Sequence, residues 1–152
     1  SFDYAMELLE NKNFIKPILD FTSFQKNKLL GICVGMQILA SNSEEGNKLG
    51  LNLIPGNVKK FKKIKILPHV GWNAVANSRE NKLLGARQDN SKFYFLHSYY
   101  FEPREQKYQI GSTNYFEYFA SMVNNENIYG VQFHPEKSHD AGKIIFKNFA
   151  NL

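Results

Sequence analysis

The stretch from Lys26 to Ser41 constrains the fold more than any other part of the sequence. It reads KNKLLGICVGMQILAS, in which a short apolar run ends in Gly31-Ile-Cys-Val-Gly35 and apolar residues then recur at helical spacing. This pattern predicts a strand, a sharp turn and a helix, with Cys33 at the apex of the turn. We expect glycines on both sides of the cysteine, because such a strained turn brings neighbouring backbone too close for a Cβ atom.

Cys33 is the only cysteine among the 152 residues. A lone cysteine in a globular chain is most often a small buried apolar residue, and this interpretation stays open on the thiol alone. At the apex of the turn, the N-terminus of the following helix favours negative charge, which predicts a lowered thiol pKa and a reactive thiolate. A base and an orienting acid elsewhere in the chain would indicate a nucleophile.

A candidate base and acid lie near the end of the chain, in His134-Pro-Glu136 after the apolar segment Ile128–Phe133. Residues two apart in an extended segment face the same side, so His134 and Glu136 are predicted to reach each other or one shared site. With Cys33 they supply the nucleophile, base and orienting carboxylate of covalent acyl transfer. Together with His139 they also have the residue types of metal ligands. No second cysteine or regularly spaced histidine supports a metal, so we expect none.

The composition bounds the class of protein. The chain is 43% apolar and 14% aromatic, which is enough for a real core in one domain spanning residues 1–152. A single cysteine excludes an internal disulfide and fits a reducing compartment. No apolar run approaches the roughly 18 residues of a membrane span, and no basic-then-apolar signal segment opens the chain. We therefore expect a cytoplasmic protein without a membrane partner.

The net charge of +5 and the isoelectric point of about 9.2 raise the question of nucleic acid. The strongest cluster is the segment 57–65, NVKKFKKIK, with five lysines between apolar residues. A half-buried surface strand with a solvated lysine face explains this pattern at least as well. Since neither arginine clusters nor exposed stacking motifs accompany the lysines, we expect no nucleic-acid partner. A partner or an anionic phosphorylated substrate arriving over the basic face stays open.

The remaining segments predict the architecture. Helical patterns cover Phe2–Asn11, Phe14–Gln25 and Ala141–Asn151, and strand patterns cover Val58–Leu67, Phe93–His97, Tyr108–Tyr115, Phe119–Asn124 and Ile128–Phe133. Residues 42–50 are expected to be a polar loop, Pro68–Asn73 a turn, and Asn124–Asn127 a hairpin turn. Helices and strands come first, then mostly strands, then a helix. This order predicts an α/β fold whose sheet has an antiparallel portion.

Four motifs, in the same order, resemble those of a known family. GICVGMQ at residues 31–37 and GVQFHPEKS at residues 130–138 resemble the class I (triad) glutamine amidotransferases. PHVGWN at residues 68–73 and FYFLHSYY at residues 93–100 are similar to the glutaminase subunit of imidazole glycerol phosphate synthase, the HisH-type family. The resemblance covers essentially the whole chain. It implies a flavodoxin-like mixed sheet flanked by helices, with the N-terminal strands missing.

The resemblance also implies a reaction and a partner. L-Glutamine would lose its side-chain amide through a thioester on Cys33, without a cofactor. The ammonia would pass to a cyclase-type (β/α)8-barrel synthase subunit, the partner in a heterodimer, which makes imidazole glycerol phosphate in histidine biosynthesis. Two alternatives stay open. One is a paralogous subunit that supplies ammonia for sugar amidation in surface glycan biosynthesis, and the other is a catalytically impaired regulatory subunit, against which the intact Cys33, His134 and Glu136 speak.

The family pattern assigns further residues to the substrate. It implies glutamine recognition by Gln37, Glu45, Ser98 and Tyr99, and an oxyanion-binding N–H on Val34. The chemistry agrees, because a zwitterionic amino acid needs an acceptor for its ammonium group, and Glu45 supplies one. Without the resemblance, a solvated helix face for Gln37 and a solvated loop for Glu45 are the simpler interpretations.

Two positions bear on the partner. Trp72 resembles the family residue that lines the way from the glutaminase site to the synthase, and Lys137 resembles one that pairs with an acid across the interface. An aromatic residue at a turn is otherwise ordinary core or hairpin packing.

This chain departs from the family pattern at the N-terminus. The family domain begins with a βα unit and a second strand ending in a Pro-Gly-x-Gly loop, just before the helix that starts at Ser1 in this chain. We expect these elements to be absent. That loop would supply the second oxyanion donor. One such donor is worth on the order of 10²-fold in rate, so its absence would impair catalysis.

Overall fold

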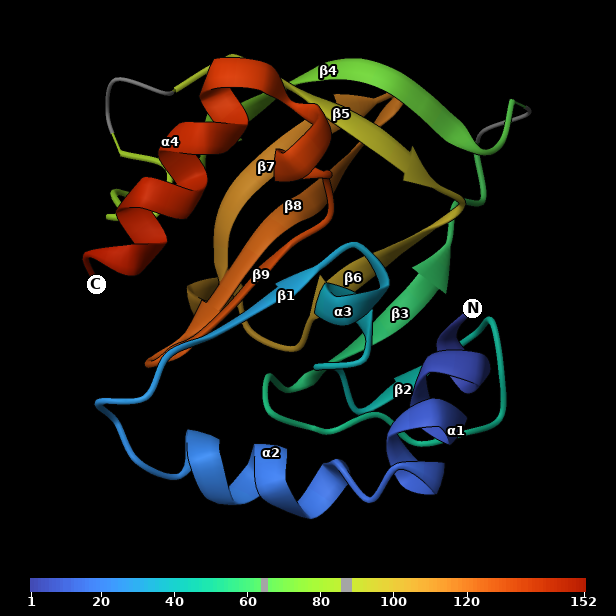
Figure 1. Ribbon diagram of the computed structural model, residues 1–152. Helices are drawn as coiled ribbons and strands as arrows, with labels where there is room; N and C mark the ends of the chain where they lie inside the picture. The colour runs from blue at the N-terminus through green and yellow to red at the C-terminus, as the bar shows by residue number, and fades with distance from the viewer. Residues whose placement is uncertain (64–65, 86–88) are drawn as a thin grey trace.

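The computed structural model describes residues 1–63, 66–85 and 89–152 (Figure 1). Its α-helices are α1 (Phe2–Asn11), α2 (Ile15–Thr22), α3 (Val34–Gln37) and α4 (His139–Ala150). Its strands are β1 (Leu29–Ile32), β2 (Asn42–Ser43), β3 (Gly56–Lys60), β4 (His69–Asn77), β5 (Ser91–His97), β6 (Tyr99–Pro103), β7 (Gln109–Tyr115), β8 (Glu117–Asn125) and β9 (Ile128–Val131). Short 3₁₀ helices cover η2 (Gln106–Tyr108) and η3 (Pro135–Lys137).

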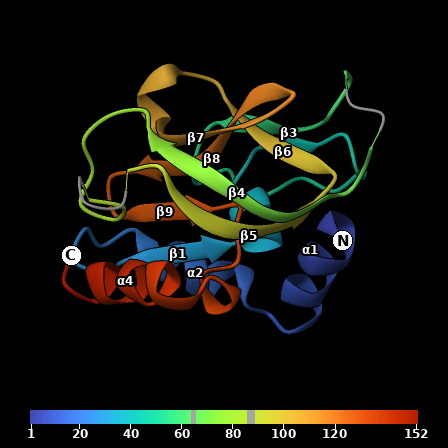
Figure 2. The same cartoon turned by 90° about the horizontal axis from the view of Figure 1, so that it is seen from above.

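The strands form a mixed sheet, as predicted. β1 runs parallel to β9 and β2 parallel to β3, whereas the pairs that connect the rest are antiparallel. β8 pairs with β7 along one edge and with β6 and then β9 along the other, so it joins the two halves of the sheet. Helices α1, α2 and α4 lie on the same side of the strands (Figure 2).

The core consists of two clusters of buried apolar side chains. The first includes Phe93 and Phe95 of β5, Phe133 just after β9 and Ile145 of α4, and the second includes Phe2 and Met6 of α1. Ile32, the last residue of β1, packs against the first cluster, and Met36 of α3 belongs to the second. The turn between β1 and α3 therefore lies where the two clusters meet, with its ends held by both. Burial of large apolar side chains of this kind contributes about 1.5–3 kcal/mol each.

Several predicted elements are confirmed with adjusted bounds. Helix α1 has the predicted range, α2 is shorter than predicted and carries Pro17 in its first turn, where proline is tolerated. The predicted hairpin turn joins β8 to β9, which pair up to Asn125 and Ile128. The helix predicted after Cys33 from the spacing of apolar residues is present but short. It is the single turn α3, after which the chain bends toward β2. The strands β2 and β6 were not predicted.

The prediction of a turn at residues 68–73 is wrong. From His69 onward the chain forms β4, which pairs with β5 from His69 opposite His97 to Val75 opposite Ser91. Pro68 stands just before the strand, and Gly71, with φ of +117°, keeps its place in the pairing. The side chains alternate, so that His69 is buried whereas Val70 and Trp72 are exposed.

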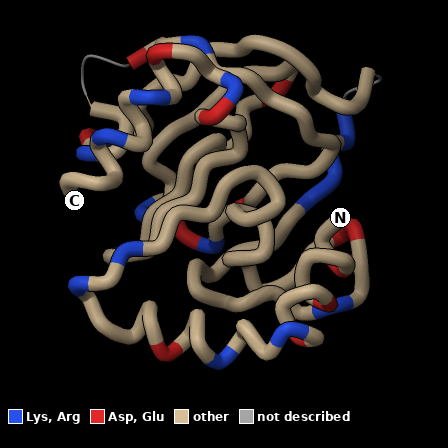
Figure 3. The backbone as a smooth tube through the Cα atoms, in the orientation of Figure 1, with Lys and Arg blue, Asp and Glu red and all other residues tan. Residues whose placement is uncertain are grey.

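The strand predicted over Val58–Leu67 is confirmed only as far as Lys60, where β3 ends, and the prediction is wrong for residues 61–63 and 66–67, which lie outside any strand. Val58 in β3 and Phe61 after it are buried, and Lys59 lies 3.5 Å from Glu44 and 3.9 Å from Glu102. Ile64 and Lys65, which the predicted strand included, lie outside the described residues. Figure 3 shows the basic stretch along β3 and other charges on the helices and loops around a largely uncharged sheet. No described helix combines the length and apolar character needed to cross a membrane.

Candidate active site

Cys33 lies at the apex of the sharp turn between β1 and α3. Its backbone has φ of 54° and ψ of −113°, a conformation that non-glycine residues rarely adopt. A Cβ atom on Gly31 would lie 2.4 Å from the carbonyl oxygen of Gly35, so the close approach predicted for this side of the turn is confirmed. The same prediction is wrong for Gly35, where an added Cβ would meet nothing within 4 Å.

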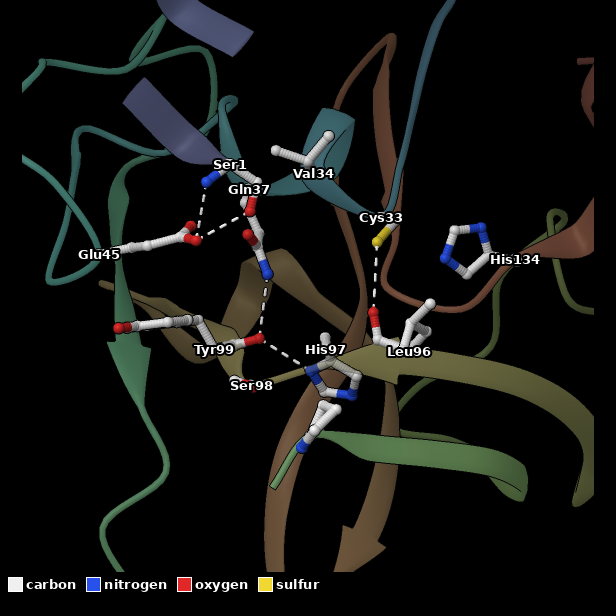
Figure 4. A pocket seen from close by; sticks show the side chains of 11 residues that line it. Ser1, Cys33, Val34, Gln37, Glu45, Leu96, His97, Ser98, Tyr99 and His134 are labelled. Atoms are coloured by element: carbon white, nitrogen blue, oxygen red, sulfur yellow. Dashed lines mark hydrogen bonds and ion pairs between the residues drawn. The ribbon is translucent and has the colours of Figure 1, made fainter. Parts of the chain in front are cut away.

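The Cys33 thiol opens into a cavity of about 390 Å³ (Figure 4). The cavity is lined by seven of the predicted site residues, namely Cys33, Val34, Gln37, Glu45, Ser98, Tyr99 and His134. The rest of the lining consists of Ser1, Pro68, Leu96 and His97. Elements distant in the sequence thus meet at one site of the size that small-molecule pockets usually have. Glu136, Trp72 and Lys137 lie outside the lining.

His134 is held by Glu136 and faces the nucleophile. The Nδ1–H of His134 donates to Glu136 Oε1 at 2.7 Å, which leaves Nε2 as the ring atom with a free lone pair. His134 Nε2 is buried and has no hydrogen-bond partner among the described residues. Figure 4 shows the imidazole ring beside the Cys33 sulfur at one end of the cavity. The predicted contact is confirmed, but it is made across the 3₁₀ turn η3 and not along an extended segment.

The environment of the Cys33 thiol raises its pKa. Burial is the main cause, and the negative charges of Glu136 and Glu45 act in the same direction, against the N–H of Val34 and the side chain of Gln132. The prediction of a lowered pKa is therefore wrong. A single helical turn has little macrodipole to set against the loss of solvent. The thiol consequently needs a base to become a nucleophile.

A buried glutamine that the motifs left without a role touches the nucleophile. Gln132 is fully buried, its Nε2 lies 3.8 Å from Cys33 Sγ, and its Oε1 accepts a hydrogen bond from Gln37 Nε2 at 3.0 Å. Gln37 Nε2 also donates to the carbonyl oxygen of Tyr99 at 3.0 Å. The sequence feature that could have pointed to Gln132 is its polar amide side chain within the otherwise apolar segment before His134.

Glu45 presents a carboxylate at the opposite end of the cavity from His134 (Figure 4). Its Oε1 accepts a hydrogen bond from Ser1 Oγ at 2.8 Å, and its Oε2 accepts from Phe2 N at 3.1 Å. Burial by itself raises the pKa of Glu45, but these hydrogen bonds prevail and hold the pKa below its usual value. The side chain is thus an anion suited to a cationic group.

Two histidines that the motifs did not assign form a buried pair, of which His97 lines the cavity. His69 Nδ1 and His97 Nε2 are 2.9 Å apart, and the side chains are 3% and 6% exposed. Burial lowers the pKa of His69 to about 4 and that of His97 to about 3. Both rings are therefore neutral near pH 7.

Mild acidification is expected to destabilise the protein through this pair. The pKa of both histidines lies below the ordinary value of 6.5, so the unfolded chain binds more protons between pH 6.5 and pH 4. The stabilisation is complete above pH 6.5 and is lost as the pH falls toward 4. We expect a melting temperature several degrees lower at pH 5.5 than at pH 7, measured by calorimetry.

The control is His69→Phe, which should show a smaller drop between the same pH values. The comparison of the variant with the wild type, and not the wild type alone, isolates the contribution of the pair. An equal drop in both proteins would contradict the assignment.

Trp72 and Lys137 lie on the surface beside the cavity. Trp72 is 46% exposed and stacks on His139 with ring centroids 5.1 Å apart, and Lys137 Nζ lies 5.7 Å above the Tyr94 ring. We call the exposed side chains of Val70, Trp72 and Leu96 the β4–β5 patch. Leu96 also lines the cavity, so the patch reaches its rim. Within the described part of the chain, no group of three or more His, Cys, Asp or Glu side chains is placed to hold a metal ion.

Comparison with known proteins identifies the family of the chain. The family model described as "Glutamine amidotransferase class-I" matches residues 10–152. The chain is 48% identical to the imidazole glycerol phosphate synthase subunit HisH of Leptospira borgpetersenii, covering all of this chain and 77% of the relative. It is 45% identical to the subunit of the same name from Bdellovibrio bacteriovorus, again over all of this chain and 77% of the relative.

Solved structures share the fold at low sequence identity. A glutamine amidotransferase from Thermotoga maritima superposes with a TM-score of 0.61 and 20% identity, over 95% of this chain and 54% of the other. A second glutamine amidotransferase gives a TM-score of 0.68 at 13% identity, over 95% of this chain and 72% of the other. The chain thus spans about half to three quarters of these structures.

Proposed function

The chain belongs to the class I glutamine amidotransferase family, in its HisH-type branch, and from this premise we propose that it is the glutaminase subunit of an imidazole glycerol phosphate synthase. It hydrolyses L-glutamine to glutamate and supplies the ammonia to a synthase subunit in histidine biosynthesis. One observation carries the proposal. The Nε2 of His134, which has no hydrogen-bond partner in residues 1–63, 66–85 and 89–152, faces the cavity that the thiol of Cys33 also lines, and Glu136 is bonded to the other ring nitrogen.

Substrate binding uses the charge at the far end of the cavity. The carboxylate of Glu45 accepts the α-ammonium group of glutamine, and Ser98 and Tyr99 form the wall along which the substrate lies. Gln37 fixes that wall, because its amide nitrogen is bonded to the Tyr99 carbonyl. The side-chain amide then reaches the sulfur at the other end.

Acylation transfers a proton before the leaving group departs. His134 Nε2 takes the proton of the Cys33 thiol, and the sulfur attacks the side-chain carbonyl carbon of glutamine. The oxyanion that forms is stabilised by the N–H of Val34. The imidazolium then donates its proton to the amide nitrogen, the C–N bond breaks, and ammonia leaves a glutamyl thioester on Cys33. Glu136 stabilises the imidazolium and keeps the proton on Nδ1 of the neutral ring.

Deacylation repeats the sequence with water. His134 Nε2 takes a proton from a water molecule, which attacks the thioester carbonyl. The C–S bond breaks, the sulfur regains a proton from the imidazolium, and glutamate dissociates. Because the pKa of the Cys33 thiol is raised, the departing sulfur takes up this proton readily and returns to the thiol form.

The partner is a cyclase-type (β/α)8-barrel subunit that docks over the cavity rim to form a heterodimer. The β4–β5 patch supports this placement, because exposed apolar side chains around a site mark interaction surfaces. Trp72 lines the path of the ammonia and Lys137 meets an acidic residue of the barrel. A biosynthetic role and a free thiol in the site both fit the reducing environment of the cytoplasm.

Removal of Glu136 is expected to slow the reaction without abolishing it. Glu136→Ala should lower kcat by about 10²-fold, because nothing then holds the His134 tautomer, and Glu136→Gln by about 10-fold, because an acceptor oxygen remains. Glutamate release at saturating glutamine measures both. The control is Asp140→Asn, which removes a carboxylate that is 90% exposed and should leave kcat unchanged. Wild-type kcat in Glu136→Ala would refute the assigned role.

The proposed function is tested by following glutamate release from L-glutamine with and without the barrel subunit. We expect release to be weak for the chain alone and to rise when the barrel and its phosphorylated ribulosyl substrate are present, with imidazole glycerol phosphate as the product. Turnover of glutamine without that product, but with amidation of a sugar, would overturn the assignment to histidine biosynthesis. Absence of turnover in both conditions would overturn the glutaminase itself.

A further inference from the structure

The carbonyl oxygen of Tyr99 is bonded from two sides. It accepts from Gln37 Nε2 at 3.0 Å and from His97 Nδ1 at 2.8 Å, so both of its lone pairs are used. Tyr99 belongs to the cavity wall. This stretch of wall is therefore fixed by one donor from α3 and another from β5.

The bond to this carbonyl determines the protonation of the buried histidines. A carbonyl can only accept, so His97 carries its proton on Nδ1, and its Nε2 must accept from His69 Nδ1 at 2.9 Å. His69 Nε2 must then accept from Asn73 Nδ2 at 3.3 Å. The Asn73 amide is oriented for this, since the same nitrogen donates to the Asn114 carbonyl at 2.9 Å. A consistent set of donors thus runs from β4 to the cavity wall.

The same contacts continue to the nucleophile on the other side of Tyr99. Gln37 Nε2 donates to Gln132 Oε1 at 3.0 Å, and the remaining amide nitrogen of Gln132 lies 3.8 Å from Cys33 Sγ. The orientation of the Gln132 amide is fixed by the Gln37 donor, which leaves its own N–H groups to the sulfur.

We propose that these contacts form one relay that positions the glutamine-binding wall and the nucleophile relative to each other. The relay consists of Asn73, His69, His97, Tyr99, Gln37 and Gln132. The proposal deepens the glutaminase function and depends on it, because the relay matters for turnover only if glutamine occupies the cavity. Its members are positioning residues, since they act through the Tyr99 peptide and the sulfur.

Burial makes the relay sensitive to the loss of any member. Gln37, His69, His97 and Gln132 are all less than 7% exposed, so water cannot replace a missing donor without rearrangement. A buried acceptor left without a donor is unfavourable, which favours movement of the neighbouring groups to new partners. A change at one end is therefore transmitted to the wall.

The surroundings of His69 allow its hydrogen bonds to be removed without removing its packing. Its ring stacks on Phe95 at 4.8 Å and on Tyr115 at 3.9 Å between centroids, and it does not line the cavity. Phenylalanine keeps an aromatic ring in this stack but cannot donate to His97. Asparagine loses the ring, but its amide nitrogen takes the place of the donor Nδ1.

The experiment compares His69→Phe with His69→Asn in the chain assayed together with its barrel subunit. We expect His69→Phe to raise KM for glutamine about 10-fold while kcat changes less than about 3-fold, because the binding wall moves and the triad does not. His69→Asn should restore KM to within about 3-fold of the wild type. Equal KM in His69→Phe and the wild type, or equal impairment in both variants, would overturn the relay.

The other end of the relay is tested at the sulfur without glutamine. Gln132→Met keeps the size of the side chain but removes the donor to Cys33 Sγ, so the pH profile of Cys33 alkylation by iodoacetamide should shift to higher pH. His69→Phe should shift the same profile in the same direction by a smaller amount. Unchanged profiles in both variants would overturn the relay. Because alkylation needs no glutaminase activity, a failure of the proposed function appears separately, as absent glutamate release by the wild type.

Discussion

Replacement of Cys33 by alanine is expected to abolish glutamine hydrolysis, with kcat for glutamate release lower by at least about 10⁴-fold. The thioester cannot form without the sulfur, and Cys33 is the only cysteine in the chain. Alanine occupies the same backbone position at φ of 54° with the same Cβ atom, so the turn itself should persist. The measurement is glutamate release by the complex with the barrel subunit.

Ammonium salts provide the control for Cys33→Ala. The synthase reaction of the proposed complex should continue when ammonium replaces glutamine, because the proposed barrel partner would need only ammonia from this subunit. Cys33→Ser separates volume from nucleophilicity, and should also lose nearly all activity because a hydroxyl is a far weaker nucleophile than a thiol at neutral pH. Glutamate release at the wild-type rate by Cys33→Ala would contradict the whole catalytic assignment.

Substitution of Gly31 by alanine is expected to have the second largest effect. The new Cβ would lie 2.4 Å from the Gly35 carbonyl oxygen, and contacts this short with rigid backbone force the turn to open. We expect a loss of about 3 kcal/mol in the free energy of unfolding, at the upper end for overpacking. A shift of about 1 Å in the sulfur should also lower kcat by about 10²-fold.

The matched control is Gly35→Ala on the other side of the same turn. An added Cβ there meets nothing within 4 Å, so stability and kcat should both stay near the wild-type values. Urea denaturation and glutamate release measure the two properties for each variant. If the two alanines behaved alike, the close approach of Gly31 to Gly35 would not be what shapes the turn.

Much of the fold could be predicted from the sequence because its signals are local. The apolar spacing in α1 and α4 and the Asn-rich turn between β8 and β9 depend on neighbours in the chain, and these elements are present. The segment 68–73 could not be predicted in this way. Proline and glycine favour a turn locally, but pairing with β5 along seven residues outweighs that preference.

In the candidate site too, local features could be predicted from the sequence and features that depend on the complete fold could not. The turn at Cys33 and the His134-Pro-Glu136 segment could be predicted, because each is a short sequence pattern associated with one kind of chemistry. The raised pKa of the Cys33 thiol could not be predicted, since it depends on burial that only the complete fold produces. The same holds for His69, whose partner His97 is 28 positions away and reaches it only through strand pairing.

The two-residue repeat of β4 has a consequence for which mutations this region tolerates. His69 and Asn73 face inward to the buried hydrogen bonds, whereas Val70 and Trp72 face outward. Inserting or deleting one residue in this strand would exchange the two sets, placing tryptophan in the interior and the imidazole in solvent. A change of length in this strand is therefore far more disruptive than a change of residue type on its outer face, because a substitution there alters only the docking surface whereas a shift of spacing alters both faces at once.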